Sequence, residues 1–350
     1  MKSAKDQLRQ KLQEQLIAGQ SAAKWAPREK SAGKKTAQEM AKFFGMTPKF
    51  YRRNIADLSD TVEDKMCARQ WDTINFSQVP SVAAARYQKA FGRNTTTYAT
   101  YKEGLANGTE KITAGAIYPY NVIQSIKTGD TTVAKAQWEA LPNYIGDELV
   151  LPMCDVSGSM SSAVGGNKNL TCLDVCISLG LYLADKNTGP FKDCFLTFST
   201  HSKIEVLRGD ILSKYNQLSR AQWDMSTNLH GAFEEILRVG NTNKVADKDM
   251  PKYVLIMSDM QFNSCTKHDD SAIEMIRRKY EASGFTLPKV IFWNLNSHAG
   301  QSPVSFNEQG TALISGFSPA IMTSVLKAEA ITPEQIMLQT VNVPRYEVIV

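Results

Sequence analysis

The sequence has no apolar run of about 18 residues, the length that a membrane-spanning helix needs. Its first residues, MKSAKDQLRQKLQEQL, lack the apolar core and the small-residue cleavage site of a secretory signal. These two absences predict an intracellular, cytoplasmic protein that does not act in a membrane. Histidine is scarce, at 4 residues in 350, and no Walker motif or GxSxG nucleophile elbow occurs. We therefore expect a protein that is not an enzyme and has no small-molecule substrate.

Cysteine is also sparse, and the residues present form no obvious ligand set. The six cysteines stand at positions 67, 154, 172, 176, 194 and 265, among Val, Leu and Phe residues. Cys172 and Cys176 share one face of an expected helix, so a metal or redox pair is the alternative to simple packing. No second cysteine pair or histidine cluster accompanies them, and free cysteine packs as a small hydrophobic residue. We expect core cysteines in a reducing compartment.

The net charge of +5 is concentrated at the N-terminus. Residues 1–60 hold 13 Lys or Arg and 6 Asp or Glu, a balance of +7, so the remaining residues sum to −2. In the densest basic segment, KWAPREKSAGKK, lysines and arginines can neutralise phosphates while the tryptophan stacks on a base. The alternative is a solvated helical surface with the tryptophan in the core. The candidate RNA-binding residues are Lys24, Trp25, Arg28, Lys30, Lys34 and Lys35.

Two halves of the chain differ in their hydrophobic pattern. From residue 1 to about 145 the apolar spacing is helical, and TAQEMAKFFG carries a capping box in which Thr36 precedes the helix and Glu39 follows three residues later. From residue 146 on, near-continuous apolar strands such as ELVLPMCDV and PKYVLIMSD alternate with amphipathic helices, which indicates a mostly parallel sheet covered on both faces. We predict an all-helical domain, 1–145, followed by a Rossmann-like α/β domain, 146–350.

Short polar residues follow two of the predicted strands. Asp155, Ser157 and Ser159 lie in the loop after ELVLPMC, and Asp259 follows the strand in VLIMSDMQF. Thr227 precedes a helix between these strands. Ligands of such sheets bind at the carboxyl ends of the strands, and an all-oxygen set of carboxylates and hydroxyls suits a hard divalent cation. The expected ion is Mg²⁺, with Mn²⁺ or Ca²⁺ as alternatives. Asn294 and Asn296, at the end of a third strand, are expected to line the same face.

These residues resemble the metal-ion-dependent adhesion site (MIDAS) of von Willebrand factor A (vWA) domains. The matching elements are DVSGS, the threonine of STN and the aspartate of MSDMQF, in the order that the family has. The resemblance implies that Ser157, Ser159 and Thr227 bind the metal directly and that Asp155 and Asp259 often act through water. It also implies one open coordination position, which an acidic group of a partner would fill.

A second resemblance covers about residues 20–350. The segments YRRNIADLSD, KITAGAIYPYNVI and SGFSPAIM look like those of a family of uncharacterised proteins from bacteria, viruses and plants. That family resembles the Ro ribonucleoproteins, in which a helical-repeat TROVE module precedes a vWA domain. The relationship implies binding of structured RNA through the helical half.

Two functions remain open at this point. The first is a Ro-like ribonucleoprotein component, favoured by the basic N-terminus. The second is a protein–protein adaptor that binds an acidic partner at its metal, such as those that serve AAA+ ATPases. The short helical half favours the adaptor, since about 145 residues is little for a closed RNA-binding ring.

Overall fold

The computed structural model divides into two compact units, Met1–Thr113 and Ala114–Val350. It describes residues 23, 26–29, 32–59, 61–127, 131–164, 167–197, 202–221, 229–259, 270–296, 311–316, 326, 334, 337, 338, 341 and 342. Among these residues, no helix combines the length and apolar character that a membrane span requires.

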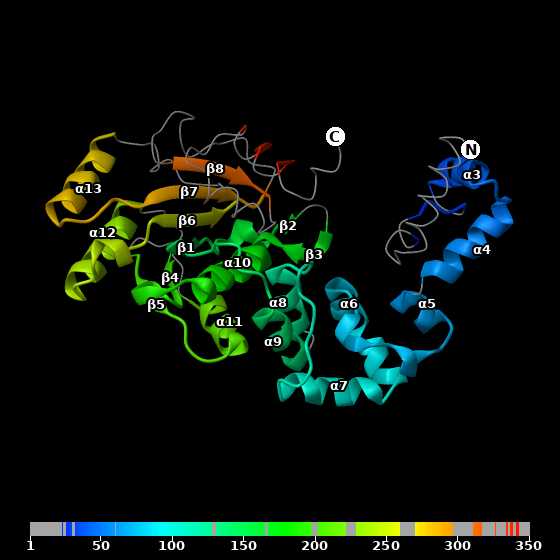
Figure 1. Ribbon diagram of the computed structural model, residues 1–350. Coiled ribbons are helices and arrows are strands. Elements are labelled where there is room, and N and C mark those ends of the chain that lie inside the picture. The colour runs from blue at the N-terminus through cyan, green and yellow to red at the C-terminus, as the bar shows by residue number, and fades with distance from the viewer. Residues whose placement is uncertain are drawn as a thin grey trace. The chain divides into compact units, whose positions relative to one another are not determined.

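The first unit is helical, as its hydrophobic spacing predicts (Figure 1). Its described helices are α3 (Lys34–Phe43), α4 (Pro48–Ser59), α5 (Val62–Cys67), α6 (Ser81–Asn94) and α7 (Thr97–Ala106), with 3₁₀ turns at Trp71–Thr73 and Phe76–Gln78. The capping box predicted at Thr36 is wrong, because α3 begins two residues earlier at Lys34. The N–H of Ala37 bonds to the carbonyl oxygen of Gly33 at 2.8 Å, so Thr36 already lies inside the first turn.

Two small cores hold the helices of this unit. Buried Ala37 and Ala41 of α3 pack against Tyr51 and Ile55 of α4. The second core is aromatic and joins the Phe76 turn to α6 and α7. Its rings belong to Phe76, Phe91, Tyr98 and Tyr101, and the ring centroid of Phe76 lies 5.0–5.5 Å from those of the other three.

The second unit contains the predicted α/β sheet. Its six strands run in the order β5-β4-β1-β6-β7-β8, and all neighbours pair in parallel except β4 and β5. The strands are β1 (Val150–Cys154), β4 (Cys194–Thr197), β5 (Ile204–Val206), β6 (Tyr253–Ser258), β7 (Lys289–Asn294) and β8 (Thr311–Ser315). A hairpin of β2 (Ala163–Val164) and β3 (Asn167–Thr171), which the sequence analysis did not predict, lies between the loop after β1 and the next helix.

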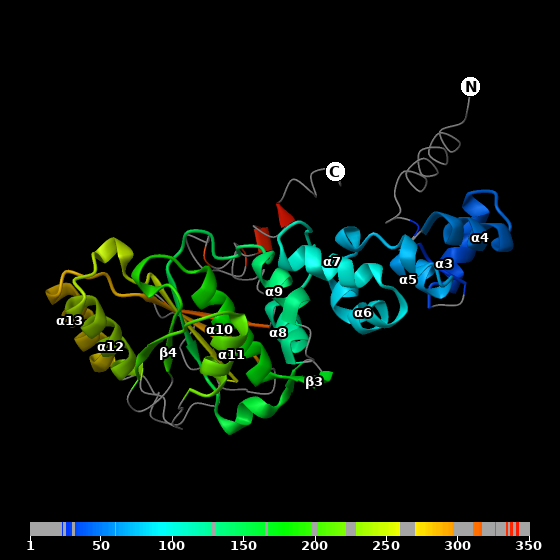
Figure 2. The ribbon, with the colours of Figure 1, turned by 90° about the horizontal axis from the view of Figure 1, so that it is seen from below.

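Helices cover both faces of the sheet. The helices of this unit are α8 (Pro119–Lys127), α9 (Thr131–Glu139), α10 (Cys172–Lys186), α11 (Ile211–Ser219), α12 (Leu229–Thr242) and α13 (Asp270–Ala282). On one face, α12 and α13 pack side by side over a core that includes Leu151 and Ile256 (Figure 1). On the other face α10 lies close to β1, with α11 beside it (Figure 2). Gly180 of α10 faces the sulfur of Cys154 and the end of the Met257 side chain.

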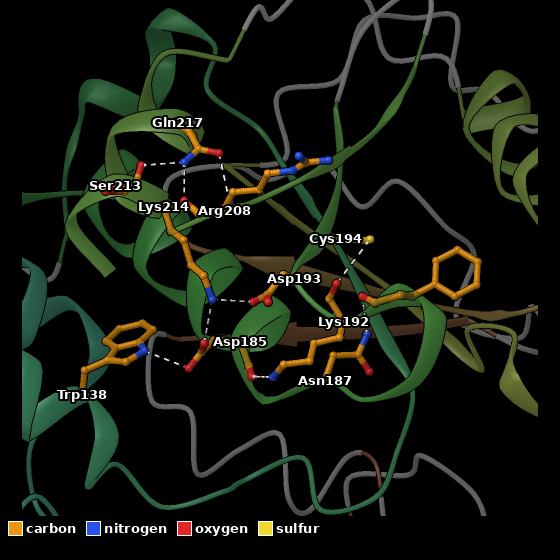
Figure 3. A network of polar contacts seen from close by, with 11 residues as sticks. Trp138, Asp185, Asn187, Lys192, Asp193, Cys194, Arg208, Ser213, Lys214 and Gln217 are labelled. Carbon is orange, nitrogen blue, oxygen red and sulfur yellow. Dashed lines mark hydrogen bonds and ion pairs between the residues drawn. The ribbon is translucent and has the colours of Figure 1, made fainter. Parts of the chain in front are cut away.

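A polar network joins α9, α10 and α11 at the amino end of β4 (Figure 3). The Lys214 ammonium donates to Asp185 at 3.0 Å and to Asp193 at 2.6 Å. The Trp138 indole N–H donates to the other oxygen of Asp185 at 2.9 Å. Nearby, the Tyr182 hydroxyl of α10 donates to the Pro142 carbonyl at 2.6 Å, just after α9. The helices that precede the sheet in sequence are therefore bound to the helices that cover it.

The hydrophobic pattern places a domain boundary at residues 145/146, and this boundary stays a prediction. The compact units divide earlier, between Thr113 and Ala114, because α8 and α9 pack against α10.

Candidate metal centre

The loop after β1 is built around the Asp155 carboxylate. The sheet ladder continues one residue past β1, since the Asp155 N–H bonds to the Met257 carbonyl at 3.0 Å. The backbone then turns around the Asp155 side chain, and the Ser157 N–H donates to Asp155 Oδ1 at 2.9 Å. Such a turn is a common local structure of aspartate. It brings the Ser157 and Ser159 hydroxyl oxygens to 3.0 Å from each other at the start of a short 3₁₀ turn, Gly158–Ser161.

The neighbouring strand supplies the second half of the site. In the parallel pairing of β1 and β6, Cys154 lies opposite Met257, so Asp155 comes level with Ser258, the last residue of β6 before Asp259. The Ser258 hydroxyl donates to Asp155 Oδ2 at 2.6 Å. Asp155 is 6% exposed and Asp259 is 1% exposed, so two carboxylates are buried at adjacent strand ends.

The oxygen positions fit a small hard cation. An octahedral Mg²⁺ holds oxygen ligands at about 2.0–2.1 Å, so that two neighbouring ligands lie about 2.8–3.0 Å apart. The Ser157 and Ser159 hydroxyls have this spacing while they share a hydrogen bond. The donor set of carboxylate and hydroxyl oxygens is also the one that such ions prefer.

The sequence-predicted metal ligands are largely brought together. Asp155, Ser157 and Ser159 share one loop, and Asp259 follows Ser258, which is bonded to Asp155. Thr227 lies outside the described residues. Among the residues that the structure describes, no group of three or more His, Cys, Asp or Glu side chains could hold a metal ion, so the candidate set depends on its serine hydroxyls as well as its carboxylates.

Further polar contacts join the residues just after β7 to the residue just before the β2–β3 hairpin. The Asn296 amide donates to the Ser162 hydroxyl at 3.1 Å, and the Cys172 N–H bonds to the Ser162 carbonyl at 2.9 Å. Asn294 accepts the Asn296 N–H through its side chain at 2.9 Å. Asn296 therefore follows the end of β7, and the expectation that Asn294 and Asn296 line the metal face stays a prediction. Sequence reasoning missed Ser258, which only the pairing of β1 with β6 brings to Asp155, and Ser162, whose N–H bonds to the nearby Ser159 carbonyl at 3.1 Å.

The cysteines behave mainly as core residues. Cys154, Cys172, Cys176 and Cys194 are buried. The Cys172 and Cys176 thiols lie 3.6 Å from the carbonyl oxygens of Leu295 and Met257, respectively, and burial raises the pKa of both thiols. The prediction is wrong for Cys67, which is exposed at the end of α5. Cys265 lies outside the described residues.

The candidate RNA-binding residues fall in the first unit. Arg28, Lys34 and Lys35 are exposed, the two lysines on the first turn of α3. Lys24, Trp25 and Lys30 lie outside the described residues. The packing of the tryptophan therefore stays a prediction.

Comparison with known proteins finds two matching family models, a similar viral protein and a similar solved structure. A family model described as a domain of unknown function (DUF7788) matches residues 150–345, more than half of the chain. A second, also described as a domain of unknown function (DUF2828), matches residues 15–148. The uncharacterised protein L728 of Acanthamoeba polyphaga mimivirus is 29% identical over 91% of the chain, and the chain spans 60% of its length. The crystal structure of the Deinococcus radiodurans Ro (RSR) protein matches with a TM-score of 0.47 at 15% identity, over 92% of this chain and 77% of that one.

Proposed function

The chain belongs to the family defined by the domain of unknown function DUF7788, and we propose that its sheet-containing unit is a non-enzymatic, metal-dependent binding module. A divalent cation is held by Asp155, Ser157 and Ser159, with Thr227 and Asp259 completing the set. The remaining coordination position accepts an acidic group of a partner, as in the MIDAS of vWA domains. The proposal is carried by the pair of serine hydroxyls 3.0 Å apart beside the hydrogen-bonded Asp155 carboxylate.

Electrostatics supports a cation at this edge of the sheet. Asp155 and Asp259 are both more than nine-tenths buried at neighbouring strand ends. Burying an ionised carboxylate is costly unless it is paired or coordinates a metal, so a divalent cation at these strand ends offsets that cost. Mg²⁺ or Mn²⁺ fits the serine pair better than Ca²⁺, whose bonds of about 2.3–2.6 Å spread neighbouring ligands further apart.

The partner that we favour is RNA, bound through the basic helices as in a Ro-like ribonucleoprotein component. Lys34 and Lys35 of α3 are exposed, and so are Lys49 and Arg53 of α4, although Arg53 pairs with Asp57 at 3.8 Å. Between the last two, Phe50 is 56% exposed, which is unusual for a phenylalanine and suits stacking on an unpaired base. Lysine and arginine contacts to phosphates make such binding salt-dependent.

Native purification in Mg²⁺, with and without chelator, tests both parts by recording bound RNA and bound protein together. We expect RNA that survives chelation and leaves at high salt, and we expect the double charge reversal Lys34→Glu/Lys35→Glu to reduce it. Lys248→Glu, on the exposed surface of the other unit, is the matched control. Asp155→Ala is expected to abolish metal-dependent partner binding.

Other outcomes separate the two parts of the proposal, the metal module and the RNA partner. A protein partner that is lost on chelation, with no RNA, supports the metal module but replaces the RNA by an adaptor function, such as that of proteins serving AAA+ ATPases. Chelator-sensitive partner binding that is unchanged in Asp155→Ala contradicts the metal module itself, whereas RNA held by the basic helices is expected to stay bound in this variant.

A further inference from the structure

The carboxylate of Asp155 is oriented from two sides. Its Oδ1 accepts the N–H of Ser157, two residues along the chain, at 2.9 Å. Its Oδ2 accepts the hydroxyl of Ser258 at 2.6 Å, a bond between residues 103 positions apart. The first bond fixes the turn of the loop. The second bond fixes the side chain relative to another strand.

Ser258 is itself held by the sheet. It is fully buried at the last position of β6, and its register partner on β7 is Asn294. Its carbonyl accepts the Leu295 N–H at 3.0 Å, so the backbone of Ser258 is bonded to the strand beside it. A hydroxyl on this rigid backbone offers the Asp155 carboxylate a donor at a nearly fixed position.

A buried hydroxyl at the end of an otherwise apolar strand needs a reason. The strand sequence YVLIMS is buried at every position, and the first five side chains are apolar or aromatic. Burying a hydroxyl costs free energy unless a hydrogen bond compensates it, and here the acceptor is a carboxylate that the sequence assigns to the metal site. Residues that orient metal-binding carboxylates typically change metal affinity 10- to 100-fold when removed.

We infer that Ser258 is a positioning residue of the candidate metal centre. Its hydroxyl holds the Asp155 carboxylate in the orientation that lets this side chain act together with the Ser157 and Ser159 hydroxyls. It also ties the loop after β1 to the strand that carries Asp259, so that both carboxylates are presented at a fixed spacing. This inference rests on the proposed cation site. It adds to that site a residue that orients a ligand without contacting the ion.

The test measures Mn²⁺ affinity of the full chain by electron paramagnetic resonance of the free ion, together with the melting temperature. Ser258→Ala is expected to weaken Mn²⁺ binding about 10-fold or more. The matched control is Ser178→Ala on α10, because Ser178 is also fully buried and its hydroxyl donates to a protein oxygen, the Val175 carbonyl, at 2.9 Å. Ser178→Ala should lower the melting temperature to a similar extent and leave Mn²⁺ affinity unchanged. Ser258→Thr retains the hydroxyl and should restore most of the affinity.

The inference and the proposed function fail in different ways. Wild-type affinity in Ser258→Ala, with affinity lost in Asp155→Ala, overturns the role of Ser258 and leaves the metal site standing. Affinity that stays low in a well-folded Ser258→Thr protein overturns it as well. Equal Mn²⁺ binding by the wild type and Asp155→Ala, or no binding by either, contradicts the metal site and Ser258 with it.

Discussion

At the scale of single residues, the candidate site combines one local turn with one long-range bond. The turn from Asp155 to Ser157 depends on neighbours in the chain, so the DVSGS sequence is enough to predict that these side chains converge. The bond from Ser258 depends on the register of β1 against β6, which apolar periodicity does not specify. For this reason the sequence points to the candidate ligands but not to Ser258, the residue that we propose orients one of them.

The two serine hydroxyls lead to a prediction with a close control. Ser157→Ala and Ser159→Ala each remove one oxygen of the pair and are expected to weaken Mn²⁺ or Mg²⁺ binding at least 10-fold. Ser161→Ala, in the same 3₁₀ turn but exposed, should change affinity less than twofold. Isothermal titration with each ion measures the three variants. Equal losses in all three would show that the turn, and not the hydroxyl pair, determines affinity.

Gly180 gives a prediction about packing. A Cβ at this position of α10 would overlap the Cys154 sulfur and lie 3.6 Å from a methyl group of Leu218. Gly180→Ala should therefore destabilise the protein by about 1–3 kcal/mol, despite the higher helix propensity of alanine. Chemical denaturation measures this change.

Two further variants test whether the clash with Cys154 causes the destabilisation expected for Gly180→Ala. Cys154→Ala removes the sulfur, so the double variant should be more stable than the sum of the two single changes predicts. Gly92→Ala, in the last turn of α6, meets only an ordinary 3.9 Å contact with Tyr98 and should stabilise by up to about 1 kcal/mol. Additive effects of Gly180→Ala and Cys154→Ala would contradict the steric explanation.

At the scale of helices and strands, sequence pattern and structure agree best where local signals are strong. The apolar runs predicted for the sheet all occur as strands, and α10 begins at a true capping box formed by Thr171 and Asp174. The capping box predicted at Thr36 fails because Lys34 and Lys35 favour a helix, which therefore begins two residues before Thr36. The β2–β3 hairpin was not predicted, since its strands are short and polar.

The network around Lys214 predicts an acid-sensitive contact between helices (Figure 3). Burial raises the pKa of Asp185, but hydrogen bonds from Lys214 and Trp138 outweigh it and hold this pKa below its ordinary value. Because the folded-state pKa is depressed, the stabilisation is present above the unfolded pKa of about 3.9 and is lost as the pH falls through the folded pKa. Asp185→Asn should therefore be clearly less stable than the wild type at pH 7, and this difference should shrink below about pH 4.

Urea denaturation at pH 7, 5, 4 and 3 measures that difference. Asp147→Asn removes an exposed carboxylate of the same unit and serves as the control, with little effect expected at any of these pH values. A stability difference between Asp185→Asn and the wild type that stays constant down to pH 3 would contradict the role given to the Asp185 charge.

At the scale of the whole molecule, the packing of α8 and α9 decides at which residue the chain can be truncated to leave a stable α/β unit. Helical spacing assigns them to the N-terminal half, and the two family models meet at residues 148 and 150. The packing assigns them to the unit that begins at Ala114. Sequence periodicity identifies a helix but not the partner that its apolar face contacts, and this accounts for the difference.

Truncation tests this assignment. A fragment that starts at Ala114 should unfold cooperatively with nearly the stability of the same unit in the full chain. A fragment that starts at Val150 loses the Pro142 carbonyl and the Trp138 indole that bond to α10, and it should be destabilised by several kcal/mol or fail to fold. Calorimetry and circular dichroism distinguish the two. Equal stability of both fragments would show that α8 and α9 are dispensable to the sheet.

The strand order also has a consequence for the protein as it is being made. β1 lies between β4 and β6, and Ser258 follows Asp155 by 103 residues. At a synthesis rate of about 5–20 residues per second, β1 leaves the ribosome about 5–20 s before the strand that pairs with it along its full length. During that time its buried side chains have α10 to pack against but no β6. The candidate metal centre therefore forms late, after α10, α11 and α12, which precede β6 in the sequence, have been synthesised.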